Sequence, residues 1–161
     1  MHTTIDYPNN RFIFITRDEK NIINQHKKEF SGKKMDFIMW NDHYMMGQGF
    51  YNNKQVNMFF DSGLVVVGAV DGQIAQSWMC LTQESMQELG IEERDSTSIT
   101  TITKTNDNIS FAGMSHDNVL LSLSSNPHEF GGINCDLLIS HGLIQNYAWS
   151  INFDEMTYTF K

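Results

Sequence analysis

The feature that most constrains this chain is the repeated alternation of short apolar runs with turn residues. Residues 11–16 (RFIFIT), 35–40 (MDFIMW) and 55–60 (QVNMFF) each alternate or carry aromatic and β-branched side chains, as strands do. The pairs Asn52-Asn53 and Asp71-Gly72 separate such runs and favour tight turns, because Asn, Asp and Gly tolerate positive φ. A chain of 161 residues is long enough for one domain with a core. The pattern predicts an all-β domain.

The composition excludes several classes of partner. The net charge is −8 and the pI is about 5.0, so the chain lacks the basic surface that nucleic-acid binding needs. Its one basic cluster, residues 26–34, is interpreted as a solvated surface segment. No apolar run reaches about 18 residues, so no membrane span is expected. The first ten residues have no signal-peptide pattern; a secreted or periplasmic location stays open if a signal peptide lies upstream.

Local signals predict the remaining elements. Residues 82–90 carry the clearest helix signal, with Thr82 as a possible N-cap and Gly90 after the last turn. Residues 20–30 fit either a short amphipathic helix or an exposed linker. A hairpin is expected around residues 106–108 and a loop over 126–132. A buried strand should cover 133–140, a short helix or turn 141–147, and a closing hairpin 148–160.

The two ends of the chain carry a weak internal repeat. Residues 4–14 (TIDYPNNRFIF) and 150–160 (SINFDEMTYTF) share a hydroxyl residue, Ile, Asp or Asn and an aromatic, then three turn residues and a second aromatic pair. Two unrelated aromatic hairpins could look this similar by chance. Alternatively, each segment closes one copy of the same structural unit.

Asp61-Ser62-Gly63 interrupts apolar sequence between residues 55–60 and the valines that follow. A carboxylate at the end of an apolar strand costs free energy unless it is hydrogen-bonded or paired. Backbone N–H groups of a tight turn could supply those bonds. For the tripeptide taken alone, an ordinary turn between two strands is the better explanation, because Asp, Ser and Gly are common in turns.

The order of the parts resembles one lobe of the pepsin/retropepsin-like aspartic peptidases. FFDSG ends an apolar strand, a helix ending ELGI and a Ser/Thr-rich hairpin region follow, and LLISHGLIQNYAWSINFD closes the chain. The resemblance covers about residues 46–160. It implies an all-β, retropepsin-like (acid protease) closed-barrel lobe over residues 35–161, with one or two short helices. Residues 17–34 would be a linker or surface segment. Residues 1–16 would be N-terminal strands or the closing hairpin of a preceding lobe, which makes the chain the C-terminal half of a two-lobed bacterial protein.

The resemblance also assigns roles to residues. Asp61 would be the catalytic carboxylate, Ser62 would bond across the two lobes and Gly63 would form the tight turn. Leu138, Ile139 and Ser140 would form the apolar, substrate-binding segment beside the Asp loop. In the family that segment ends in glycine, where this chain has Ser140.

This departure requires either a wider backbone path or a shifted register in which Gly142 serves instead. The stretch 65–78 is also longer than the usual link between the Asp loop and the helix.

The implied reaction is peptide-bond hydrolysis by an activated water, without a cofactor. Two carboxylates about 3 Å apart share one proton in such a site, and this chain has a single Asp-Ser/Thr-Gly. Cleavage of a peptide or protein substrate is therefore expected to need a second lobe or a homodimer. The isolated chain is expected to be weakly active or inactive. The alternative is a non-catalytic module that binds peptides or dimerises.

Other chemistries have less support in the sequence. The six His residues show no HExxH or HxH spacing, so no metal site is predicted. No GxSxG motif accompanies Ser62. Cys80 and Cys135 are interpreted as two buried free thiols, with a single disulfide as the alternative.

Overall fold

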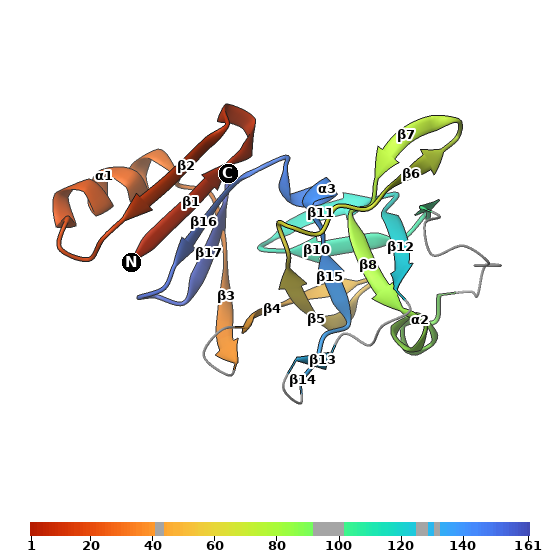
Figure 1. The fold of residues 1–161 in the computed structure, drawn as a ribbon. Coiled ribbons are helices and arrows are strands. Elements are labelled where there is room, and N and C mark those ends of the chain that lie inside the picture. The colour runs from red at the N-terminus through yellow and green to blue at the C-terminus, as the bar shows by residue number, and fades with distance from the viewer. Residues whose placement is uncertain (41–43, 92–101, 125–128, 131–132) are drawn as a thin grey trace.

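The computed structural model describes residues 1–40, 44–91, 102–124, 129–130 and 133–161. Strands dominate (Figure 1). They are β1 (His2–Asp6), β2 (Arg11–Ile15), β3 (Lys33–Trp40), β4 (Tyr44–Tyr51), β5 (Lys54–Phe60), β6 (Val67–Val70), β7 (Gln73–Gln76), β8 (Met79–Thr82), β9 (Thr103–Lys104), β10 (Asn108–Phe111), β11 (Met114–Asp117), β12 (Leu120–Ser124), β13 (Glu129–Phe130), β14 (Ile133–Asn134), β15 (Leu137–Ile139), β16 (Ala148–Asn152) and β17 (Thr157–Phe160). The helices are α1 (Lys20–Glu29), α2 (Gln83–Leu89), α3 (His141–Ile144) and the 3-10 turn η1 (Tyr7–Asn9).

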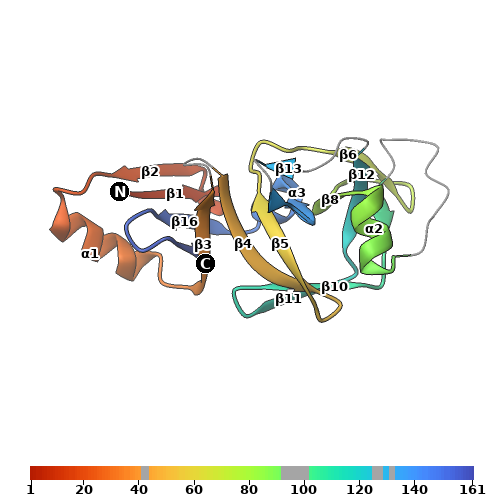
Figure 2. The same cartoon turned by 90° about the horizontal axis from the view of Figure 1, so that it is seen from below.

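One continuous sheet links the two ends of the molecule. Its strand order is β2-β1-β16-β17-β3-β4-β5-β15-β8-β12-β9, with β10 and β11 attached through β4. The strands from both chain ends, with α1 against them, form one end (Figures 1 and 2). The remaining strands, with α2 and α3, form the other. Strand β3 joins the two parts because it pairs with both β17 and β4.

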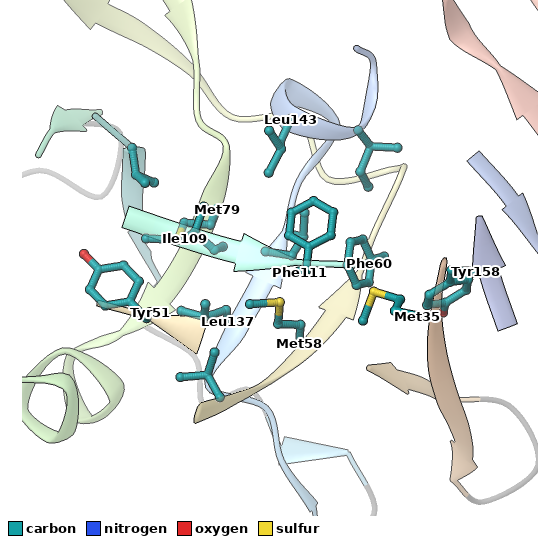
Figure 3. Packing of buried hydrophobic residues seen from close by; sticks show 14 of the residues in the cluster. Met35, Tyr51, Met58, Phe60, Met79, Ile109, Phe111, Leu137, Leu143 and Tyr158 are labelled. Atoms are coloured by element: carbon teal, nitrogen blue, oxygen red, sulfur yellow. The ribbon is translucent and has the colours of Figure 1, made fainter. Parts of the chain in front are cut away.

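The core lies where β15 runs between β5 and β8. Strand β15 is parallel to β5, with Leu138 opposite Phe59, and antiparallel to β8, with Leu138 opposite Cys80. A strand paired on both edges needs apolar side chains, which explains the LLI sequence of β15. Phe60 occupies the centre of an aromatic cluster that reaches Phe111 and Tyr158 (Figure 3).

Most predictions from local sequence are confirmed. Asn52 and Asn53 turn between β4 and β5 with φ of 46° and 69°, and Asp71-Gly72 turns between β6 and β7 with φ of 52° and 77°. The Thr82 hydroxyl accepts a hydrogen bond from the Ser85 N–H, and Gly90 ends α2 with a φ of 70°. The short helix and the closing hairpin form α3 and the β16–β17 pair, whereas the buried strand predicted over 133–140 is divided into β14, which pairs with β13, and the core strand β15.

Three expectations need correction. The hairpin predicted around residues 106–108 turns instead at Ala112-Gly113, between β10 and β11. Asp107 accepts hydrogen bonds from Tyr51 and Asn52, so this polar segment serves a long-range contact and not a turn. Residues 20–30 form α1, and His26 within the basic cluster is buried, so that cluster is not entirely a solvated surface. Of the loop expected over 126–132, the structure describes Glu129 and Phe130, which form strand β13 instead; the other residues lie outside the described part of the chain.

Both cysteines are free and buried, as the simpler interpretation predicted. Burial raises the pKa of the Cys135 thiol to about 12 and also raises that of Cys80, so both thiols stay protonated and unreactive at neutral pH. Among the helices in the described part of the chain, none has the length and apolar character needed to cross a membrane.

Candidate active-site loop

Strand β5 carries Asp61 to the end of the core. Its alternate residues Val56, Met58 and Phe60 are 2, 0 and 3% exposed, so the apolar face of the strand ends one residue before the carboxylate. The Asp61 N–H donates to the Ile139 carbonyl at 2.9 Å, which extends the parallel pairing of β5 with β15 by one residue. The backbone of Asp61 is therefore held by the core, while its half-buried side chain lies at the boundary with solvent.

The loop after Asp61 folds back on the carboxylate. The Gly63 N–H donates to Asp61 Oδ1 at 2.9 Å, and the Leu64 N–H donates to the Asp61 carbonyl at 3.3 Å. The first bond is that of an Asx turn. Ser62 is half-buried, and its hydroxyl has no hydrogen-bond partner in the described part of the chain. Oδ2 of Asp61 likewise has no partner among those residues, so one carboxylate oxygen can bind an outside group.

Gly63 has more freedom than a tight turn requires. A methyl group added there would meet only Asp61 Oδ1, at 3.4 Å, and its φ lies outside the left-handed region. The space around Gly63 would therefore accept an alanine side chain. Gly63 takes part in the tight turn through its N–H, as the resemblance implied, and this bond does not depend on the missing side chain.

The segment Leu138, Ile139 and Ser140 lies directly beside the Asp loop. Leu138 is half-buried, while Ile139 and Ser140 are fully buried. The Ser140 N–H donates to the Trp78 carbonyl at 2.9 Å, and its hydroxyl donates to the Ser77 carbonyl. A serine is therefore accommodated at this position because its hydroxyl finds a buried acceptor.

The glycine at which two backbones approach closely is Gly142. A Cβ there would lie 2.2 Å from the Ser77 carbonyl oxygen, well inside van der Waals contact. Ser77 in turn donates its N–H to the Val66 carbonyl, and His141 donates its N–H to the Leu64 carbonyl, at 2.9 and 3.0 Å. The close contact of Gly142 is therefore to Ser77 and not to the Asp loop, so the shifted register considered from the sequence stays a prediction.

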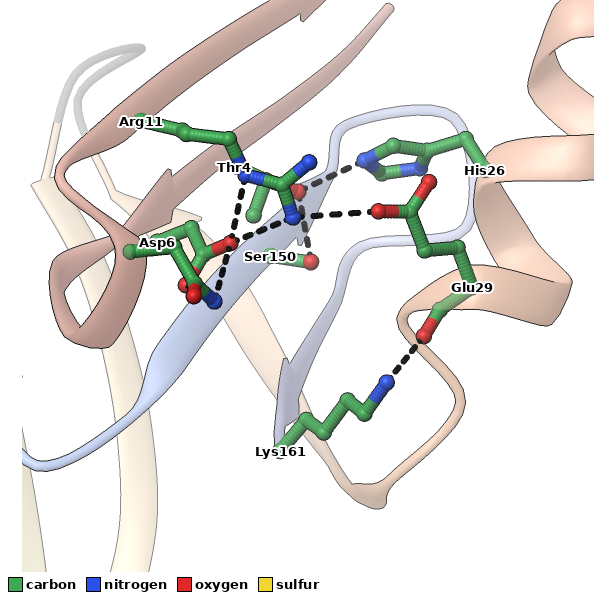
Figure 4. A network of polar contacts seen from close by, with 8 residues as sticks. Thr4, Asp6, Arg11, His26, Glu29, Ser150 and Lys161 are labelled. Atoms are coloured by element: carbon green, nitrogen blue, oxygen red, sulfur yellow. Dashed lines mark hydrogen bonds and ion pairs between the residues drawn. The ribbon is translucent and has the colours of Figure 1, made fainter.

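The buried carboxylate of Asp6 is paired differently from that of Asp61. Asp6 is 1% exposed and accepts hydrogen bonds from Arg11 at 2.6 and 2.9 Å and from Asn9 (Figure 4). Burial opposes ionisation of Asp6, yet the bonds from Arg11 and Asn9 hold its pKa below the ordinary value. Asp61 has no ion pair in the part of the chain that the structure describes. The only polar partner of its carboxylate there is the Gly63 N–H of its own loop, whereas the Asp6 carboxylate holds a cation from the next strand.

Sequence reasoning missed two contacts near this loop. The His141 ring packs edge-on against Tyr7, with centroids 5.0 Å apart, so it contacts the N-terminal segment. Ser77 organises the loop region: its hydroxyl donates to the Met79 carbonyl at 2.6 Å, and its carbonyl is the acceptor for Ser140. Neither residue belongs to a recognisable motif, and the contacts to Tyr7 and Ser140 join segments more than 60 residues apart, so no local signal could have found them.

Comparison with known proteins finds similarity only among solved structures. No protein-family model and no curated protein matches the chain. A retropepsin-like aspartic protease from Rickettsia conorii aligns with a TM-score of 0.49 and 15% identity, covering 79% of this chain and 89% of that one. The retroviral protease-like domain of Ddi1 from Leishmania major aligns with a TM-score of 0.41 and 14% identity, covering 73% and 91%. The chain resembles these retropepsin-like structures, and it shares with them a mainly β architecture.

Proposed function

We propose that this chain is an aspartic-peptidase-like lobe and that Asp61 is one of two catalytic carboxylates. The observation that supports this most directly is the placement of Asp61. A rigid, doubly paired strand region delivers it to the surface, and one oxygen is oriented by Gly63 while the other stays open to an outside group.

The chemistry follows from pairing this carboxylate with a second one. Two carboxyl groups about 3 Å apart cannot both ionise easily, so they hold one proton between them. The ionised group removes a proton from water, whose oxygen attacks the peptide carbonyl carbon. The protonated group hydrogen-bonds to the carbonyl oxygen, and the C–N bond breaks as the nitrogen takes up a proton. Ser62, whose hydroxyl is uncommitted in the described part of this chain, is the proposed contact to the second lobe.

The test is cleavage of a broad peptide library at mildly acidic pH by the protein with its second lobe. Asp61→Asn keeps the shape of the side chain and removes its charge, so cleavage should fall by about a hundredfold or more. Asp71→Asn is the matched control, because it makes the same change in an exposed turn where Asn tolerates the positive φ of 52°. Equal cleavage by wild type and Asp61→Asn would refute the catalytic role.

A non-catalytic peptide-binding or dimerisation module is the second candidate. It is favoured by the single Asp-Ser/Thr-Gly in the chain, because this motif supplies one carboxylate and the reaction needs two. Peptide binding or dimerisation would not require the second carboxylate. This candidate predicts peptide binding that Asp61→Asn leaves unchanged, with no cleavage by either protein.

A further inference from the structure

The two terminal hairpins are related by a local two-fold axis. Strands β1 and β16 pair antiparallel, with Thr4 opposite Ser150 and Ile5 opposite Trp149. The repeat noted in the sequence places Thr4 and Ser150, 146 positions apart, at equivalent places. Thr4 and Ser150 are partners across the β1–β16 pair and also occupy the same position of the repeat, so a two-fold axis that relates the hairpins passes between them. The two hydroxyls meet there, 2.6 Å apart (Figure 4).

The turns obey the same relation. Asn10 and Met156 are equivalent in the repeat, and both have a φ of 51°. Positive φ is uncommon for a methionine, so this agreement is a strong sign of the same turn. Strands β2 and β17 are therefore equivalent, and Phe12 and Phe14 of β2 correspond to Tyr158 and Phe160 of β17.

The surroundings of these aromatic pairs differ completely. Tyr158 and Phe160 are 0 and 2% exposed, and their rings lie 5.3 and 5.4 Å from Phe60 in the core. Phe12 and Phe14 are 67 and 55% exposed. Helix α1 does not cover them, because it packs on the opposite face, where His26 contacts Thr4.

The backbone edges differ in the same way. Strand β17 pairs with β16 on one edge and with β3 on the other. Strand β2 pairs with β1, and its other edge is paired with no strand in the described part of the chain. An open edge beside two exposed aromatic rings is a surface that proteins normally cover.

From this broken symmetry, we propose that β2 with Phe12 and Phe14 is the docking face for a second lobe of the same fold. That lobe would supply a strand equivalent to β3 along the open edge and an apolar socket equivalent to the one around Phe60. It must lack a closing hairpin of its own, since the hairpin β1–β2 fills that place. An intact second copy of this chain does not qualify, because its socket already holds Tyr158 and Phe160.

This proposal deepens the proposed function and rests on it for its purpose, because the docked lobe is the one that would bring the second carboxylate. Its support is nevertheless separate: it stands on the two-fold relation and not on the chemistry of Asp61.

Thiol labelling tests the docking face. Phe14→Cys and, as a control of similar exposure, Ile22→Cys on α1 are each introduced into the native gene. The two natural cysteines are buried, so the introduced thiol dominates reaction with a small maleimide. Each variant is labelled in the 161-residue chain alone and in the protein purified from its source, with whatever length and subunits it has there.

In the chain alone both introduced thiols should react rapidly. In the native protein we expect labelling of the Phe14→Cys variant to slow by about tenfold or more, because reaction then requires local opening, while the Ile22→Cys variant stays fast. The mass of the native protein should exceed this chain by a further lobe. Rapid labelling at position 14 in the native protein overturns the proposal, and so does protection within a dimer of two intact chains.

The Asp61→Asn variant separates this proposal from the proposed function. Protection at position 14 without any cleavage that depends on Asp61 leaves the docking face standing and refutes the catalytic role. Cleavage that depends on Asp61, with position 14 unprotected, supports the catalytic role and refutes the docking face.

Discussion

Gly142→Ala is the sharpest test of how closely α3 packs against the backbone of Ser77. The added methyl carbon would lie 2.2 Å from the Ser77 carbonyl oxygen and 2.9 Å from its carbonyl carbon. Both are backbone atoms, so no side-chain rotation can relieve the contact. The backbone φ of Gly142 is outside the left-handed region, and the substitution therefore isolates the steric effect.

The magnitude follows from three contributions. Overpacking against a fixed backbone costs about 1–3 kcal/mol. Displacing the Ser77 carbonyl also disturbs its buried hydrogen bond with Ser140, which costs about 1–3 kcal/mol. Alanine is more favourable than glycine in a helix by about 1 kcal/mol, which offsets part of these two costs. We expect a net loss of about 1–5 kcal/mol in the free energy of unfolding, or a fall of about 2–20 °C in Tm.

Urea and thermal unfolding, followed by circular dichroism, measure this loss. Gly63→Ala is the matched control, since its methyl carbon would meet only Asp61 Oδ1 at 3.4 Å, and its cost should stay within about 0.5 kcal/mol. If Gly142→Ala is as stable as Gly63→Ala, the close approach of α3 to Ser77 is wrong.

Two further predictions concern the terminal sheet. Burial lowers the pKa of His26, which contacts Thr4 at 2.7 Å, so folding favours the neutral ring; its contribution to stability is present above the unfolded pKa of about 6.5 and is lost as the pH falls below it. Urea midpoints should therefore drop between about pH 7 and pH 5, and His26→Gln should reduce that drop; an unchanged slope contradicts the assignment. Arg11→Met leaves the buried Asp6 carboxylate without its cation and should lower the urea midpoint, whereas Arg17→Met, at an exposed pair, should lower it less. Equal reductions would mean that Asp6 does not depend on Arg11.

Local elements were predictable because their causes are local. Asn52-Asn53 and Gly90 adopt positive φ for reasons contained in their own side chains, and Thr82 caps the helix that follows it. The end of an apolar strand at Asp61 is equally visible in the alternation that precedes it. These features required no knowledge of what lies across the sheet.

The tertiary structure decided which segments distant in the sequence lie side by side. Residues 106–108 have good turn chemistry, yet they pair with the β4–β5 turn, and Ala112 takes the positive φ instead. The choice between Ser140 and Gly142 depended on where Ser77 passes, more than 60 positions away. The sequence by itself determined many of the strands, the turns at Asn52-Asn53 and Asp71-Gly72 and the end of strand β5 at Asp61, because backbone preferences act over a few residues. Only the tertiary structure revealed the two-fold relation of the chain ends and the exposed pair Phe12 and Phe14, because pairing and burial depend on residues distant in the chain.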